Sequence, residues 1–361
     1  MNLLEQLGVD RVINASGRMT KLGVNTLSDS VLQAMTTAGV DYMEIDQLQR
    51  AVGGEIARLI GAEDAMVTSG AAAGIALMVA ATIAGSDLTR IQALPDPRDA
   101  PNEILIQAGH QVNFGANVTQ LIRMAGGNPV PLGSVNAVQS SHLTGAIGPL
   151  TAAFLFVQSH HTVHKGMLPL ARCIELCAEH QVPVLIDAAA EEDLARFTGS
   201  GADLVTFSGG KAIGGPTSGI VAGRADLVEA CRAQSQGIGR PMKVGKEGLL
   251  GLYAAVSDYV HRDQEAEHHR YSEMVSKLMS ELEGHCTLQR LTDEAGRGIE
   301  RVGIVDTPQR AAELVEFLQN GTPSIHPRTH LVNTGIVALD PRPLKESDVE
   351  LVARRVREFY A

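Results

Sequence analysis

Short apolar runs alternate with longer segments of helical periodicity over the first two thirds of the chain. The runs that predict β-strands lie at residues 65–68, 103–107, 152–157, 182–187, 204–207 and 219–222. The segments that predict helices lie at residues 28–37, 44–60, 169–180 and 191–197, and two more begin at Ala71 and after Asn113. Regular alternation of this kind predicts an α/β fold, with a mostly parallel sheet between layers of helices.

A different pattern follows residue 245. The long charged stretch at residues 246–282 predicts one helix that bridges to a smaller α+β domain, in which residues 309–319 and 346–360 predict two more helices. A glycine-punctuated arm precedes the large domain, and we expect it to join the small domain and the active site. The predicted boundaries are therefore 1–27 for the arm, 28–255 for the large domain, and 256–361 for the bridging helix and small domain.

The composition is compatible with a large core and with a protein that acts on small molecules. Hydrophobic residues make up 44% of the 361 residues, but only 3% are aromatic and there is no Trp, so aliphatic side chains must fill the core. The net charge of −11 argues against broad binding to nucleic acid or anionic membranes. It still allows a local basic pocket for a phosphorylated metabolite.

The start of the chain and the cysteines predict a cytoplasmic protein. The first residues lack the basic n-region of a signal peptide, and no apolar run reaches membrane-spanning length. The four cysteines form no CxxC pair, and we expect all of them to be reduced thiols. They are Cys173, Cys177, Cys231 and Cys286.

Residues that follow the predicted strands are the candidates for chemistry, because ligands of parallel α/β sheets bind beyond the carboxyl ends of the strands. These candidates are Ser69–Gly70, Gly109–His110, Ser159–His160, Asp187 and Ser208–Lys211.

Lys211 is the most informative of these candidates. It follows a strand within the glycine-rich sequence FSGGKAIGGP at residues 207–216. An amine in this setting can form an imine with the aldehyde of pyridoxal 5'-phosphate (PLP), and glycines let the backbone approach the cofactor closely. Ser208 is expected to donate its hydroxyl to the cofactor phosphate. Taken alone, the motif also fits a surface lysine in a glycine-rich loop.

Asp187 strengthens the PLP interpretation. It ends an apolar strand shortly before Lys211 in the chain. A carboxylate against the pyridine nitrogen keeps the PLP ring protonated, so that the ring withdraws electrons from Cα of the substrate. Ala189 is small enough to lie beneath the ring. The alternative is an aspartate that caps a helix at a strand–helix junction.

The turn at Ser69, Gly70 and Ala71 is the predicted phosphate site. Free backbone N–H groups and the positive end of a helix favour an anion there. No GxxxxGK[ST] or GxGxxG pattern accompanies the turn, so a nucleotide-binding interpretation has little support. A tightly packed turn of small residues is the structural alternative.

Histidines follow the next two strands. His110 is expected to stack on the pyridine ring, and Ser159 to reach the 3'-oxygen of the cofactor; a capping or packed histidine is the alternative for His110. The run His160, His161 and His164 invites a metal interpretation. We predict no metal site, because the run lies in a strand-exit loop without nearby Cys or carboxylate ligands.

The order of these residues resembles fold type I PLP enzymes with the aminotransferase-like fold. More narrowly, the chain resembles the selenocysteine-synthase-like group and, within it, the D-glucosaminate-6-phosphate ammonia-lyases. The resemblance covers nearly the whole chain. It rests on residues 13–17 (INASG), 20–23, 63–72, 187–191 (DAAAE), 208–211 (SGGK) and 239–247 (GRPMKVGKE).

The resemblance implies a homodimer or larger assembly with active sites at subunit interfaces. It implies that Arg240 and Lys243 approach a phosphate of cofactor or substrate, although a helix start with solvated lysines explains them equally well. It also marks Thr20 as a substrate-binding residue. An arginine of the small domain is expected to bind the substrate carboxylate in a bidentate contact, and of Arg328 and Arg342 we favour Arg328.

The implied activity is α,β-elimination from a β-hydroxy amino acid, such as an amino sugar acid, to a 2-keto acid and ammonia. Selenocysteine synthases carry an additional N-terminal tRNA-binding domain, whereas this chain starts almost at the core and is acidic, so we expect no tRNA substrate. Arg18 stands where the ammonia-lyase subgroup is expected to have a small or neutral residue. Alternatives are β-replacement (selenium or sulfur transfer), aldol cleavage, and a non-catalytic PLP- or sugar-phosphate-binding protein.

Overall fold

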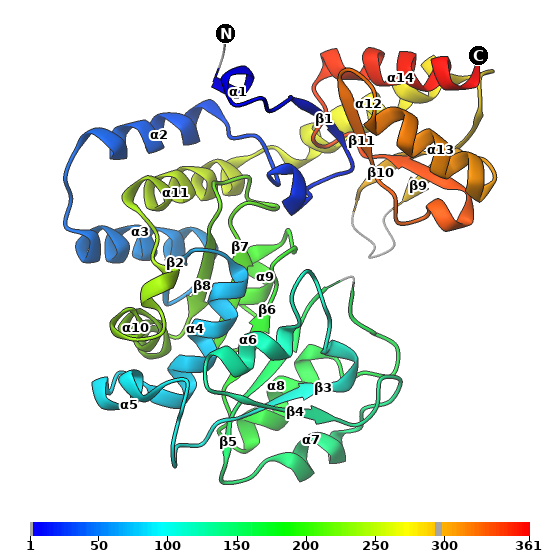
Figure 1. The fold of residues 1–361 in the computed structure, drawn as a ribbon. Helices are drawn as coiled ribbons and strands as arrows, with labels where there is room; N and C mark the ends of the chain where they lie inside the picture. Colours follow the sequence, from blue (N-terminus) through cyan, green and yellow to red (C-terminus); the bar gives the residue numbers. More distant parts are fainter. Residues whose placement is uncertain (1–2, 160, 293–297) are drawn as a thin grey trace. The chain divides into compact units, whose positions relative to one another are not determined.

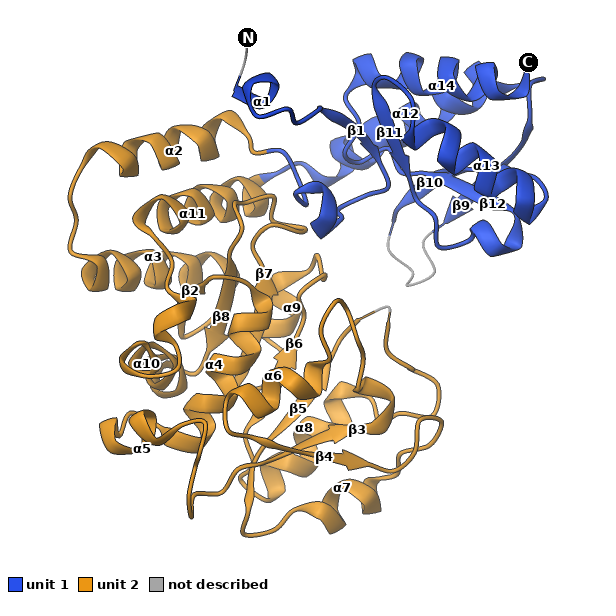
Figure 2. Ribbon diagram, viewed as in Figure 1, with its two compact units in different colours: residues 1–26, 262–361 blue, residues 27–261 orange. Residues whose placement is uncertain are grey.

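The computed structural model describes residues 3–159, 161–292 and 298–361. The chain divides into two compact units (Figure 2). The larger unit comprises residues 27–261, and the smaller unit comprises residues 1–26 together with residues 262–361. Each unit has a hydrophobic core of its own, and they are described in turn.

The larger unit is built around a seven-stranded sheet with the order β2-β8-β7-β6-β5-β3-β4. Strand β8 is antiparallel to both of its neighbours, and all other pairs are parallel, so the predicted mostly parallel sheet is confirmed. The strands are β2 (Asp64–Thr68), β3 (Glu103–Gln107), β4 (Asn128–Leu132), β5 (Thr151–Val157), β6 (Val184–Asp187), β7 (Leu204–Ser208) and β8 (Gly219–Gly223).

Strand β4 is the one strand of this sheet that the apolar pattern did not predict. It carries Pro129 and Pro131, and proline lacks the N–H group that a central strand needs. The structure places β4 at the edge of the sheet, where it pairs only with β3. An edge position leaves one side of the strand without ladder hydrogen bonds, which is why the prolines are tolerated.

Helices cover both faces of the sheet (Figure 1). One face packs on α4 (Ala71–Ala84), α5 (Leu88–Ala93), α6 (Val118–Met124) and α10 (Ala225–Ala233). The other face packs on the remaining helices of the unit, with a core that includes Phe154, Phe197 and Phe207. Those helices are α2 (Asp29–Val40), α3 (Ile45–Ile60), α7 (Ser140–Ala146), α8 (Leu170–Glu179), α9 (Leu194–Thr198) and α11 (Lys246–His261).

The smaller unit joins the N-terminal arm to the C-terminal part of the chain. Strand β1 (Val12–Ala15) pairs in parallel with β11 (Ser324–Pro327). A separate antiparallel sheet has the order β12-β10-β9. Its strands are β9 (Thr287–Thr292), β10 (Glu300–Val305) and β12 (Ile336–Leu339), and the main helices of the unit are α12 (Gln264–Leu282), α13 (Pro308–Gln319) and α14 (Glu346–Tyr360), with a short α1 (Leu3–Gln6) near the N-terminus.

The prediction of one continuous helix over residues 246–282 was wrong. The segment forms two helices, α11 and α12, and Asp263 caps the second one by accepting a hydrogen bond from the N–H of Ala266 at 3.0 Å. The capping carboxylate gives the chain an alternative to continuing the first helix. The division between the two units falls at Arg262, next to this break.

A buried ionic cluster organises the smaller unit. The carboxylate of Asp340 is 0% exposed and accepts hydrogen bonds from Arg301 Nε at 2.8 Å and from Arg342 Nη2 at 2.7 Å. Burial alone would raise the pKa of Asp340, but the hydrogen bond and charge of Arg342 and the charge of Arg301 outweigh it and hold the pKa at about 2. The backbone N–H of Asp340 also donates to the carbonyl of Ala15, which ties the arm to this cluster.

Two further sequence predictions concern disulfides and membrane helices. None of the four cysteines is paired. Within the part of the chain that the structure describes, no helix combines the length and the apolarity needed to cross a membrane.

Adjacent glycines of α3 test how closely this helix packs on β2. A Cβ atom at Gly53 would lie 1.9 Å from the carbonyl oxygen of Ala65, whereas one at Gly54 would meet nothing within 4 Å. We therefore expect Gly53→Ala to lower the free energy of unfolding by about 3 kcal/mol. The matched control, Gly54→Ala, should raise it by about 0.5–1 kcal/mol, because Ala is the better helix former. Denaturant unfolding of both variants measures this, and equal effects would show that α3 does not press on β2.

Candidate active site

Asp187 and Lys211 lie at the carboxyl edge of the sheet in the larger unit. Asp187 ends β6 and is only 4% exposed. Burial raises the pKa of its carboxyl group to about 6, although the N–H of Ala189, which donates to Oδ1 at 3.1 Å, and the positive charge of Lys211 both lower it. Lys211 is therefore close enough to act on Asp187 electrostatically. A buried carboxylate of this kind is stabilised by a cationic partner.

His110 is held in one orientation and one tautomer. It ends the short 3-10 helix η2 (Ala108–His110) that follows β3, and it is 1% exposed. Its Nδ1 accepts a hydrogen bond from the N–H of Val157 at 3.2 Å, so the neutral ring carries its proton on Nε2. Burial, together with the charge of His164, lowers the pKa of His110 to about 4. The imidazole is thus neutral at physiological pH.

The turn from Thr68 to Ala71 presents the N-terminus of α4. The hydroxyl of Thr68 donates to the carbonyl of Gly70 at 2.9 Å and closes the turn. The first N–H groups of the helix have no intrahelical acceptor, which makes the turn an anion site. Gly219 packs directly against it, because a Cβ there would lie 2.5 Å from the carbonyl carbon of Gly70.

The loop that carries Lys211 is closed by backbone hydrogen bonds. The N–H of Gly209 donates to the carbonyl of Ser218 at 2.8 Å, and the N–H of Gly215 donates to the carbonyl of Gly209 at 2.7 Å. Ser208 and Ala189 are joined by an N–H to carbonyl hydrogen bond of 3.3 Å, and both are half-buried. The predicted partners Ser208, Ala189 and Lys211 therefore belong to one connected region after β6 and β7.

Ser159 follows β5 at the same edge. Its Oγ accepts the N–H of His161 at 3.2 Å, and its carbonyl accepts the hydroxyl of Thr162 at 2.6 Å. His160 lies outside the described residues. Among residues 3–159, 161–292 and 298–361, no group of three His, Cys, Asp or Glu side chains is placed to bind a metal ion.

Three basic residues, Arg240, Lys243 and Lys246, lie close together in the chain of the larger unit. Arg240 begins the 3-10 helix η4 (Arg240–Met242), and Lys243 follows it in an extended conformation. Lys246, at the start of α11, donates to the carbonyl of Asp41, and its Nζ lies 5.7 Å from the centre of the Tyr42 ring. Lys246 therefore anchors the connection between α2 and α3.

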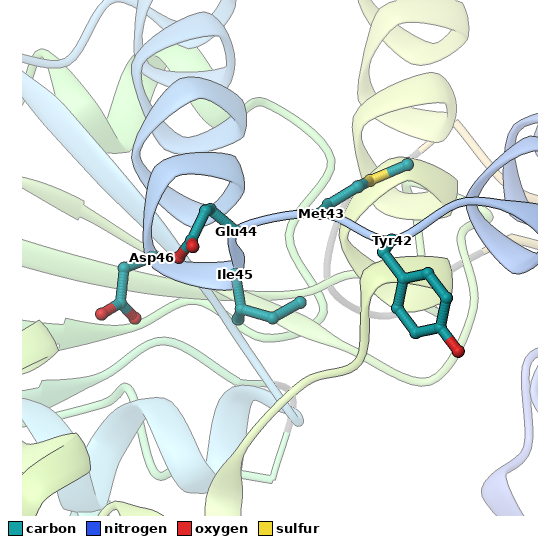
Figure 3. Close-up of a pocket in the computed structure, with 5 residues that line it drawn as sticks. All are labelled: Tyr42, Met43, Glu44, Ile45 and Asp46. Carbon is teal, nitrogen blue, oxygen red and sulfur yellow. The ribbon is translucent and has the colours of Figure 1, made fainter.

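That connection lines a surface pocket of about 570 Å³, formed by Tyr42, Met43, Glu44, Ile45 and Asp46 (Figure 3). None of the residues predicted for the site lines it. The predicted cofactor-binding residues lie instead at the strand ends described above.

In the smaller unit, the two candidate arginines differ in their partners. Arg342 donates Nε and Nη2 to the buried Asp340, at 2.9 and 2.7 Å, and its side chain is 10% exposed. Arg328 follows β11, is half-buried, and donates Nε to Nδ1 of His330 at 3.0 Å. Thr20 begins the exposed 3-10 helix η1 (Thr20–Leu22).

Sequence reasoning missed three buried polar residues near the strand ends. They are Thr68, Gln107 and Thr206, each at most 1% exposed. Gln107 donates to and accepts from the backbone of Leu168, at 3.1 and 2.7 Å, and so fixes the loop after β5. The sequence signal for them is a polar residue within or directly after an apolar run. An analysis of hydrophobic periodicity treats such a residue as an interruption of the strand and not as a candidate for the site.

The chemistry of these residues fits PLP. A buried carboxylate with a raised pKa suits a protonated pyridine nitrogen, and a neutral buried imidazole suits the ring face. The α4 N-terminus suits a phosphate, with glycines where backbones approach each other closely. A lysine amine completes the set.

Comparison with known proteins agrees with this arrangement. The family described as SelA, L-seryl-tRNA selenium transferase, matches residues 12–306. A 5'-C-glycyluridine monooxygenase-decarboxylase from a Streptomyces species is 44% identical over 98% of this chain and 91% of its own. A D-glucosaminate-6-phosphate ammonia lyase from Salmonella typhimurium is 40% identical over 99% of this chain and 98% of its own.

A solved structure of D-glucosaminate-6-phosphate ammonia-lyase matches with a TM-score of 0.93 and 38% identity, covering 100% of this chain and 98% of that chain. A solved structure of SPT with a PLP internal aldimine shares the fold, with a TM-score of 0.58 and 15% identity. These matches confirm the predicted fold class, the PLP fold type I, and the predicted resemblance.

The shifted pKa values of His110 and Asp187 predict opposite pH dependences in the cofactor-free protein. The folded pKa of His110, about 4, lies below its unfolded value near 6.5, so stability is lost as pH falls from 6.5 to 4. The folded pKa of Asp187, about 6, lies above its unfolded value near 3.8, so stability is lost as pH rises from 3.8 to 6. Each effect is on the order of 3 kcal/mol.

We therefore expect His110→Phe to lose less free energy of unfolding than the wild type as pH falls below 6.5. We expect Asp187→Asn to stabilise the protein more at pH 7 than at pH 4, compared with the wild type at each pH. Denaturant unfolding between pH 4 and pH 7.5 measures both slopes. Replacement of the exposed His180 by Phe controls for the loss of an imidazole. Slopes that change in the same direction in the two variants would contradict the assignment of the shifts.

Proposed function

The chain belongs to the SelA family of L-seryl-tRNA selenium transferases, and we propose that this member is a PLP-dependent ammonia-lyase. Its proposed substrate is a β-hydroxy amino acid of the amino sugar acid class. The relative that is 40% identical is named for D-glucosaminate-6-phosphate, which belongs to this class. The products are a 2-keto acid and ammonia. The buried carboxylate of Asp187 beside the charge of Lys211 is the observation that carries the proposal.

In this proposal the residues at the sheet edge hold and orient the cofactor. PLP, when bound, accepts the electron pair left at Cα when the Cα proton is removed. Asp187 holds a proton at the pyridine nitrogen, and the α4 N-terminus at Ser69, Gly70 and Ala71 binds the phosphate together with Ser208. His110 covers one face of the ring, and Ala189 leaves room at the other.

Lys211 acts twice. Its Nζ would hold the cofactor through the aldehyde carbon in the absence of substrate. With substrate bound, the same amine in its neutral form would take the Cα proton as a general base, and the hydroxyl on Cβ would leave as water. The released enamine would tautomerise to an imine. Hydrolysis of that imine consumes one water molecule, which balances the water lost from Cβ, so the net change is loss of ammonia. Ser159 is proposed to donate to the 3'-oxygen of the cofactor.

Four residues are proposed to bind the substrate. Arg328 is the proposed carboxylate ligand, because two of the donors of Arg342 already serve Asp340. Arg240 and Lys243 are proposed to bind a phosphate group, and Thr20 a hydroxyl of the substrate. The net charge of −11 gives no general attraction for RNA, which favours a small-molecule substrate over a tRNA.

A second activity deserves a direct test, because the relative named monooxygenase-decarboxylase has the higher identity, 44% against 40%. Both activities require bond cleavage at Cα of an amino acid. They differ in what is consumed and released: oxygen and carbon dioxide for a monooxygenase-decarboxylase, and ammonia with a keto acid for the lyase.

The deciding experiment incubates the PLP-loaded enzyme with D- and L-β-hydroxy amino acids, including D-glucosaminate-6-phosphate. We expect equal amounts of ammonia and keto acid, with no oxygen uptake. Lys211→Ala should lose the imine absorbance and at least about 10³-fold of the rate, and exposed Lys277→Ala should lose neither. Arg328→Lys should raise KM more than it lowers kcat, because a lysine cannot form the bidentate contact.

Each contrary result has a defined meaning. Oxygen uptake with carbon dioxide release would establish the second activity in place of the first. Substantial activity in Lys211→Ala would overturn the cofactor assignment. An unchanged KM in Arg328→Lys would remove that residue from the substrate site.

We further infer that the enzyme is a homo-oligomer. In the larger unit, Val40, Tyr42 and Ile45 remain 77%, 104% and 44% exposed around one connection between helices. Association would remove this apolar surface from water. Light scattering should give a mass of at least two chains, about 76 kDa from the 38.2 kDa of one chain. A monomeric mass would refute the inference.

A further inference from the structure

Thr206 occupies a position beside Asp187 that gives its hydroxyl group unusual surroundings. Strand register pairs Asp187 of β6 with Thr206 of β7, and lateral neighbours in a sheet point to the same face. The same row continues on either side with Val157 of β5 and Val221 of β8. Asp187 and Thr206 are thus the two adjacent polar side chains of an otherwise apolar row under α4.

The hydroxyl of Thr206 is fully buried and has no hydrogen-bond partner among the residues that the structure describes. Its residue is 0% exposed. Helix α4 presses on it directly, because a Cβ at Gly74 would lie 2.1 Å from Thr206 Oγ1. Valine has nearly the same shape and would bury no unsatisfied group there, so folding alone favours valine at this position. A buried polar atom without a partner needs an explanation, and we look for it in the cofactor-bound protein.

Asp187 is the group within reach. Neighbouring strands lie about 4.8 Å apart, so a threonine hydroxyl and an aspartate carboxylate in register are one side-chain rotation from a hydrogen bond. Ala189 N–H already holds Oδ1 of Asp187 from the chain that follows β6. A second donor, from β7, would restrict the carboxylate further.

The geometry points to Thr206 as a positioning residue for Asp187: its hydroxyl donates to the carboxylate when that carboxylate faces the pyridine nitrogen of PLP. The inference rests on the proposed PLP function. A donor to the carboxylate stabilises its anionic form, so the proton that the carboxylate shares with the ring nitrogen stays on the nitrogen. Gly74 serves the same end, because any side chain there would occupy the place of the hydroxyl.

The test compares Thr206→Val with the wild type in three measurements. For the cofactor-free protein we expect the melting temperature to rise by roughly 2–4 °C, because the unsatisfied hydroxyl is gone. For PLP we expect the Kd to rise about tenfold. The nitrogen-15 resonance of bound, ring-labelled PLP should move toward the value of unprotonated pyridine. A purely structural residue would change stability and cofactor affinity in the same direction.

Two further variants and a control separate the hydroxyl from its methyl group. Thr206→Ser keeps the hydroxyl, so we expect it to keep the wild-type Kd for PLP and the wild-type nitrogen-15 resonance. Thr206→Ala lacks the hydroxyl, so we expect the same higher Kd and shifted resonance as in the valine variant. This pair gives the answer even where the valine variant does not fold. Thr82→Val removes a threonine hydroxyl elsewhere in α4, one that donates to the carbonyl of Val79 at 2.9 Å, and should leave both cofactor measurements unchanged.

The outcomes distinguish the two proposals. A wild-type protein that binds no PLP would overturn the proposed function itself. A wild type that binds PLP, together with valine and alanine variants of unchanged Kd and resonance, would overturn only the role of Thr206.

Discussion

The buried carboxylate of Asp187 is the constraint around which the larger unit is arranged. A carboxyl group that is 4% exposed is costly as an anion, and its pKa of about 6 records that cost. The strand ends bring it the charge of Lys211 and the N–H of Ala189, but these only partly offset the burial. The charge of Lys211 thus leaves much of the burial cost uncompensated, and a protonated cofactor ring would reduce that cost further. A neutral His110 in the neighbouring loop adds no competing charge.

Close packing of α4 on the sheet makes this arrangement possible. Gly74 lets the helix backbone rest on Thr206, and Gly219 lets β8 approach the turn at Gly70. A helix that lies this close delivers its N-terminal N–H groups to the same edge that holds Asp187 and Lys211. The apolar row beneath it excludes water, which strengthens every electrostatic interaction at the edge.

The smaller unit solves a different problem with a buried charge. Asp340 is as deeply buried as Asp187, yet its pKa is about 2, because the arginines at 301 and 342 donate to it. Its backbone also holds Ala15 of the N-terminal arm, and β1 completes the attachment by pairing with β11. One carboxylate is thus paired with two arginines within the fold, whereas the proposed function pairs the other with the cofactor. The contrast lies in the partners and not in the burial.

The sequence alone determined six of the seven strands of the larger unit and the candidates Asp187, Lys211 and the turn at Ser69, because an apolar run and the polar residue that follows it are local patterns. It did not reveal the helices α5, α7 and α10. It did not reveal β4, whose prolines are tolerated only at a sheet edge, or the break at Asp263, where one capping hydrogen bond interrupts a continuing helical pattern. It also gave no sign that Thr206 stands beside Asp187 or that Asp340 engages Arg301. Lateral neighbours in a sheet and the partners of buried charges are set by contacts between distant segments, so only the tertiary structure decided them.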